Sequence, residues 1–154
     1  MNWFIELITN PYMITGLSSW LIAQVLKTII HAVINKKFCI ERFFGDGGMP
    51  SGHSATVTSV AVLCGLSLGP ASPEFAISTI LAIIVCHDAT GVRRETGKQA
   101  IVINEIIKAF DELSKEELPE VKLKEFVGHS PIQVAAGILI GALNAILMYN
   151  VLIV

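Results

Sequence analysis

The sequence predicts an all-α integral membrane protein, with about four transmembrane helices and one cytoplasmic amphipathic helix in a single membrane domain over residues 1–154. Of the 154 residues, 53% are hydrophobic and only 16% are charged, whereas a soluble domain carries about a quarter charged residues. The charges are also segregated, because every Lys and Arg lies between residues 27 and 124. The remaining chain is therefore apolar enough to lie in a bilayer.

Four apolar stretches approach the roughly 20 residues that a membrane-spanning helix needs. They cover residues 12–34, 50–68, 74–90 and 131–154. The first is interrupted only by Gln24, Lys27 and His31, and Pro70 and Pro73 break the chain between the second and the third. The second and third stretches are short, so we expect them to tilt or to be shielded by neighbouring helices.

The polar segment 91–130 contains the predicted amphipathic helix. Over residues 97–113, apolar side chains recur at close to helical spacing, and charged side chains occupy the other side. Such a helix lies on the membrane surface or covers the bundle. A charged connector follows it.

The basic residues predict the orientation. Lys and Arg follow the first and third stretches, whereas the segments at the opposite ends of the stretches contain none. By the positive-inside rule, both termini lie outside and the 35–50 and 91–130 loops lie in the cytoplasm. The N-terminal residues have no basic region before the first apolar stretch, so we expect no cleaved signal peptide. The predicted location is the cell membrane, crossed several times.

Composition also limits the partners. The net charge of −2 gives no basic surface for nucleic acid. The three cysteines lack metal-site spacing, and we expect neither a metal nor a cofactor. Four short spans bury few of their own polar side chains from lipid, and homo-oligomerisation would cover the remaining ones.

The most informative motif opens the second stretch, where residues 47–55 have the sequence GGMPSGHSA. Pro50 suits the first turn of a helix, Ser51 suits a cap, and Gly52 lets a ligand approach the backbone. A helix N-terminus favours phosphate, and His53 would stand beside such an anion with a proton to give or take. The alternative is a well-capped helix with a polar surface histidine.

Two further motifs come to the same side of the membrane in this topology. The third stretch ends in HDATGVRR, and the fourth begins with GHSP. Arg93 and Arg94 supply cations for this site, and the alternative role for one of them is to anchor the helix at the membrane surface. The carboxylate of Asp88 lies at a helix end, where it is unfavourable unless a cation such as one of these arginines pairs with it. Lys27 shares a polar stripe with Gln24 on the first stretch, and a charge at this depth usually faces a cavity or a partner. The alternative is that its side chain snorkels to the membrane interface.

These motifs resemble a known family. PSGH is the central motif of the type 2 phosphatidic acid phosphatases and the vanadium haloperoxidases, and the wider set resembles the divergent, small membrane branch related to them, over residues 27–141. The resemblance implies a phosphohistidine mechanism without metal. The implied roles are His129 as nucleophile and His53 as general acid, with Lys27, one of Arg93 and Arg94, and backbone N–H groups near Ser51 and Gly52 binding the phosphoryl oxygens.

Three departures from the pattern accompany the resemblance. Ile34 and Asn35 replace an arginine–proline pair, and Leu123 replaces an arginine. Gln133 occupies the place of a carboxylate, where it orients an imidazole but does not stabilise the imidazolium as a carboxylate does. Asp88 or Glu125 is the expected substitute.

The predicted function is hydrolysis of a phosphate monoester or pyrophosphate, on a lipid, through a phosphohistidine intermediate. The expected partners are a phosphorylated lipid or another phosphate ester, and the lipid bilayer. The alternative function is non-catalytic binding or transport of a phosphorylated lipid by the same basic groups. A third alternative is a bundle in which the polar motifs only pack helices.

Overall fold

The computed structural model describes residues 2–38, 40, 43, 45, 47–114, 123 and 128–154. All regular secondary structure in these residues is helical: α1 (Trp3–Ile8), α2 (Pro11–Asn35), α3 (Gly52–Leu68), α4 (Pro73–Thr90), α5 (Val92–Ser114) and α6 (Pro131–Leu152). Three helical segments are long and apolar enough to cross a membrane, and α3, with 17 residues, is a shorter apolar helix. The predicted helical membrane bundle is confirmed.

The helices begin where capping residues satisfy their first N–H groups. The Asn10 side chain accepts hydrogen bonds from two N–H groups of α2, and Ser51 and Ser72 each accept one at the starts of α3 and α4. Proline follows the cap of α2, α4 and α6, where a missing N–H leaves no hydrogen bond unmade. The short α1 was not predicted from the sequence.

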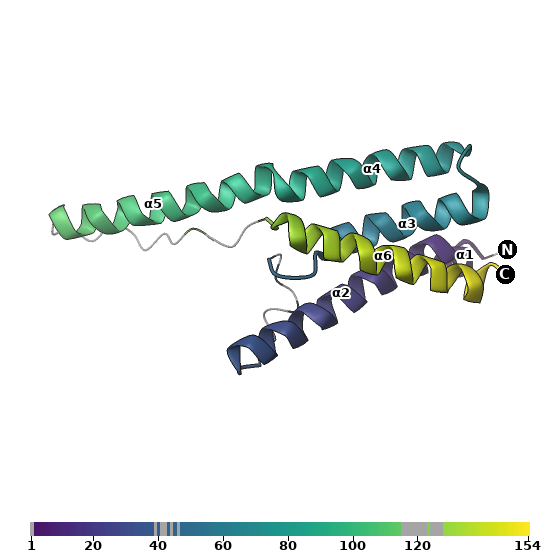
Figure 1. The fold of residues 1–154 in the computed structure, drawn as a ribbon, viewed down its shortest axis with the longest axis horizontal. Helices are drawn as coiled ribbons and strands as arrows, with labels where there is room; N and C mark the ends of the chain where they lie inside the picture. Colours follow the sequence, from purple (N-terminus) through teal and green to yellow (C-terminus); the bar gives the residue numbers. More distant parts are fainter. Residues whose placement is uncertain are drawn as a thin grey trace.

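Helices α3 and α6 cross with their backbones in contact. A methyl group on Gly137 would collide with the carbonyl oxygen of Ser51, and one on Gly141 would collide with that of Ala55. Small residues four apart allow such close approach between membrane helices. The crossing brings the beginnings of α3 and α6 to the same end of the bundle (Figure 1).

A buried polar cluster joins α6 to α2 away from that end. The side-chain amide of Asn144 donates to the hydroxyl oxygens of Ser18 and Ser19, at 2.9 and 2.8 Å. The Ser59 hydroxyl of α3 donates to the carbonyl oxygen of Thr15, at 3.4 Å. Polar side chains in membrane helices hold neighbouring helices together in this way.

Helices α4 and α5 run almost end to end, and α5 projects beyond the rest of the bundle (Figure 1). Only Gly91 separates them, and its N–H donates to the carbonyl oxygen of His87 at 2.8 Å. Among the helices described, α5 contacts α4 alone. Of the two alternatives for this amphipathic helix, lying on the membrane or covering the bundle, the second is therefore wrong, because the backbone continues the direction of α4 instead of turning back.

Candidate functional site

The site is built around the first turn of α3. Ser51 is fully buried, and its hydroxyl oxygen accepts from the N–H of Ser54 at 3.3 Å and from the Ser54 hydroxyl at 3.0 Å. Its own N–H donates to the carbonyl oxygen of Gln133 at 3.0 Å. Ser51 therefore caps the helix and docks α6. The N–H groups of Gly52 and His53, which make no such bond within the described residues, are the donors left for an anion.

His129 lies buried between the beginning of α6 and the end of α4. It is 3% exposed, and its backbone N–H donates to the carbonyl oxygen of Ala89 at 2.9 Å. Its ring Nδ1 lies 3.2 Å from Oε1 of Gln133, four residues further along. The histidine that the sequence predicted to be the nucleophile thus contacts the residue in the predicted carboxylate position.

The hydrogen bonds of Gln133 determine which nitrogen of His129 carries a proton. The N–H of Ser130 donates to Oε1 of Gln133 at 3.0 Å, so the atom facing the histidine is the amide oxygen. An amide oxygen only accepts, and Nδ1 of His129 must therefore be the protonated nitrogen. In the neutral ring, Nε2 then carries the lone pair.

The surroundings of His129 favour that neutral ring. Burial lowers the pKa of His129 below its ordinary value of 6.5, and the positive charges of Lys27 and His53 lower it further. Hydrogen bonds to Gln133 and to the backbone of Gly48 act in the opposite direction, but burial is the larger effect. The neutral imidazole is therefore favoured at this position.

His53 lies on the exposed side of the first turn of α3 and faces His129. The centroids of the two rings are 6.4 Å apart, and their planes are tilted by 60°. At this separation the two rings are neighbours in the range usual for contacting aromatic side chains. The structure thus places one buried and one exposed imidazole side by side, the two residues to which the resemblance assigned the nucleophile and the general acid.

Lys27 enters the same region from α2. It is only 4% exposed, and its Nζ donates to the carbonyl oxygen of Gly45 at 3.1 Å. Its methylenes pack on Gly48, whose φ of +101° favours glycine. Lys27 therefore points into the loop before α3 and does not extend to solvent.

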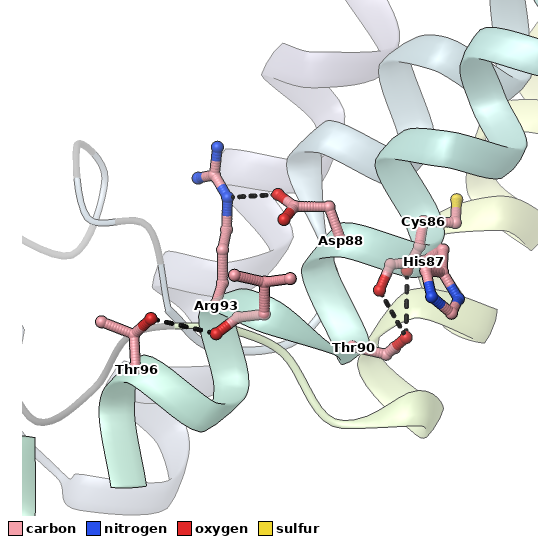
Figure 2. A network of polar contacts seen from close by, with 7 residues as sticks. Cys86, His87, Asp88, Thr90, Arg93 and Thr96 are labelled. Carbon is pink, nitrogen blue, oxygen red and sulfur yellow. Dashed lines mark hydrogen bonds and ion pairs between the residues drawn. The ribbon is translucent and has the colours of Figure 1, made fainter. Parts of the chain in front are cut away.

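Asp88 and the two arginines lie at the junction of α4 and α5. Nε of Arg93 donates to Oδ2 of Asp88 at 2.7 Å, and His87 points away from this pair (Figure 2). Asp88 thus has the cation that its helix end requires. The orienting partner of the His129 ring is Gln133 instead. Glu125, the other expected substitute, lies outside the described residues.

The backbone brings the arginine motif to the GHSP motif. Gly128 has a φ of +85°, and a Cβ there would collide with the backbone of Arg93 and Arg94. Both arginine side chains are exposed, and Arg94 forms no ion pair with a described residue. The three motifs meet at one end of the bundle, with the arginines on its outer rim.

These features can be compared with known proteins. A family model described as "Divergent PAP2 family" matches residues 8–144. The chain belongs to this family. It is also 39% identical over 152 residues to the "Uncharacterized membrane protein YuiD" of Bacillus subtilis (strain 168), a match that covers 93% of this chain and 96% of that protein. No solved structure matches the chain.

Membership of the divergent PAP2 family confirms the resemblance inferred from the motifs. In this PAP2-related chain, the described residues contain no group of His, Cys, Asp and Glu arranged to hold a metal ion. The site therefore offers imidazole, ammonium, guanidinium and amide groups. Groups of these kinds can bind an anion such as phosphate through hydrogen bonds and charge.

Sequence reasoning missed one contributor to this divergent PAP2 site. Gln24 of α2 is 6% exposed, and its amide carbon would lie 3.9 Å from a Cβ placed on Gly52. Trp20, one turn earlier, contacts the same point. The spacing of Gln24 and Lys27 predicted a shared polar face, but only the packing shows that Gln24 reaches the beginning of α3.

Proposed function

We propose that this membrane protein hydrolyses a phosphate monoester or pyrophosphate, carried by a lipid, through a phosphohistidine intermediate. One observation carries the proposal. Oε1 of Gln133 accepts from the N–H of Ser130 and lies 3.2 Å from Nδ1 of buried His129, which leaves the lone pair on Nε2. That is the tautomer a nucleophilic histidine needs.

In the first step, Nε2 of His129 attacks phosphorus. The new P–N bond forms as the bond to the leaving oxygen breaks, and His53 donates its proton to that oxygen. In the second step, water attacks the phosphohistidine and gives a proton to His53. The P–N bond breaks, and inorganic phosphate leaves with both histidines in their starting states.

The phosphoryl oxygens carry negative charge throughout, and the motif end of the bundle offers several donors that would bind them. The free N–H groups of Gly52 and His53 lie at the positive end of the α3 dipole, and Lys27 is buried nearby. Of the two arginines, Arg94 is the better phosphate ligand, since Arg93 already binds Asp88.

A lipid substrate suits the position of the site in the bundle. The three motifs lie at an end of the apolar helices, which corresponds to the level of the lipid headgroups. A headgroup phosphate would reach the site while its acyl chains stay in the bilayer. From the positive-inside distribution of Lys and Arg, this end faces the cytoplasm.

The second candidate function is non-catalytic binding or transport of a phosphorylated lipid. The neutral side chain of Gln133 favours it, because an amide adds no negative charge to stabilise a positively charged His129. The same cations and N–H groups would hold the headgroup in either case.

Phosphate release from a panel of lipid phosphates distinguishes the two functions. We expect release by the purified wild type, none by His129→Ala, and unchanged release by His87→Ala, whose exposed side chain on α4 makes it a matched control. His53→Ala should slow substrates with poor leaving groups far more than those with good ones, because its role is to protonate the leaving oxygen. If the wild type releases no phosphate from any lipid and behaves in cells like His129→Ala, the protein binds rather than hydrolyses.

A further inference from the structure

Gln24 carries a hydrogen-bond acceptor that the described residues leave unused. The residue is 6% exposed, and its Oε1 is buried without a partner. Buried side-chain acceptors are normally paired, and an unpaired one inside apolar helices is especially unfavourable. An unpaired buried oxygen of this kind points to a partner that arrives with a ligand.

The amide of Gln24 is directed toward the beginning of α3. Its amide carbon would lie 3.9 Å from a Cβ on Gly52, the residue whose N–H is free for an anion. Lys27 lies on the same side of α2, nearly one turn further on, and it too is buried. The unpaired acceptor therefore borders the place where the proposed phosphate would bind.

The chemistry of an amide oxygen restricts what can bind there. Oε1 accepts a hydrogen bond and repels an unprotonated phosphate oxygen, which is also an acceptor. A phosphate that keeps a P–OH group supplies the missing donor. Inorganic phosphate and the monoanion of a monoester have this group, and a diester at neutral pH does not.

We propose that Gln24 is a specificity-determining residue, whose Oε1 accepts a hydrogen bond from the P–OH group of the ligand and so selects monoesters over diesters. This inference rests on the phosphate site of the proposed function, and it adds a residue that makes the site prefer monoesters to diesters. Gly52 lets the ligand and the amide approach each other, because it has no side chain.

The test measures binding rather than turnover. The purified full chain in detergent is titrated with inorganic phosphate or dimethyl phosphate, and the rise in unfolding temperature yields an apparent Kd for each. We expect Gln24→Leu to weaken phosphate binding about tenfold, the effect of one lost hydrogen bond. Dimethyl phosphate binding should stay the same or become tighter, because the substitution also removes the oxygen that repels unprotonated phosphate oxygens. Gln99→Leu, at an exposed glutamine on α5, is the matched control and should change neither.

The unliganded proteins separate recognition from a structural role. Without ligand, Gln24→Leu should unfold at a temperature no lower than the wild type, because the substitution removes an unpaired acceptor. A lower unfolding temperature, with the preference for phosphate retained, would make Gln24 a structural residue and overturn the inference.

Other outcomes overturn the inference in distinguishable ways. If Gln24→Leu binds both phosphate and dimethyl phosphate more weakly than the wild type, the amide donates a hydrogen bond to phosphate instead of accepting one. A third titration uses phosphatidylglycerol, a diester with carbon-bound hydroxyl groups. If Gln24→Leu weakens its binding as much as that of phosphate, Gln24 recognises any hydroxyl group. If phosphate binds the wild type and Gln24→Leu equally well, only the role of Gln24 fails. If neither anion stabilises the wild type, the phosphate site of the proposed function fails as well.

Discussion

At the scale of single residues, Gln133 has the most influence on the chemistry of the site. Its amide oxygen accepts from the N–H of Ser130 and orients His129, so one side chain both caps α6 and sets the histidine tautomer. Its carbonyl oxygen also accepts from the N–H of Ser51, which fixes α6 against the beginning of α3. A glutamate would keep the cap and add a negative charge.

We expect Gln133→Glu to change both the rate and the pH dependence of hydrolysis. His129 attacks as the neutral ring, and burial lowers its pKa, so wild-type activity should persist below pH 6.5 and fall only when the pH drops through the lowered pKa. A glutamate stabilises the imidazolium, raises that pKa and moves the acid limb to higher pH. The plateau rate should rise about tenfold, which corresponds to about 1.4 kcal/mol of stabilisation.

The measurement is a profile of kcat/KM against pH for one lipid phosphate. Gln133→Leu is the control, since it loses both the cap and the orienting oxygen and should be nearly inactive. An acid limb that does not move in Gln133→Glu would mean that His129 is not the group that titrates.

At the scale of elements, the crossing of α3 and α6 positions the site. Gly137 and Gly141 place the backbone of α6 against the carbonyl oxygens of Ser51 and Ala55. Because these contacts are between backbones, the helices cannot adjust by rotating a side chain. The close approach also brings the N–H of Ser51 within reach of Gln133.

A methyl group at this crossing should force the two helices apart. We expect Gly137→Ala to destabilise the protein by roughly 1–3 kcal/mol, the range for overpacking a close contact, and to lower phosphate binding as α3 and α6 separate. Thermal unfolding in detergent measures the first effect. Ala135→Val, at an exposed position of the same helix, should change stability little. Full stability of Gly137→Ala would contradict the close crossing.

At the scale of the whole molecule, the two termini lie at one end and the three motifs at the other (Figure 1). Helix α5 extends α4 away from the bundle beyond the motif end. A bilayer around the apolar helices would therefore leave α5 on the side opposite the termini.

Cysteine labelling tests which side each end faces. In a background without the native cysteines, Leu113→Cys at the far part of α5 should react with an impermeant maleimide only after the membrane is opened. Val154→Cys at the C-terminal end should react in intact cells, and both positions are 85% exposed. The opposite pattern would place the motif end outside the cell.

The sequence by itself determined the helical membrane class, the family and the three motifs that form the site. Apolar length and segregated charge are properties of the chain alone, and so is the order of GGMPSGHSA, HDATGVRR and GHSP. Even the pairing of Asp88 with an arginine followed from their closeness along the chain.

Only the tertiary structure decided which atoms meet. The N–H of Ser51 binds Gln133 instead of remaining free for an anion, and Gln24 reaches Gly52 with an unpaired oxygen. Helix α5 continues α4 instead of folding over the bundle. These contacts depend on how closely helices distant in sequence approach and at what angle, and the periodicity of a single helix carries no information on either.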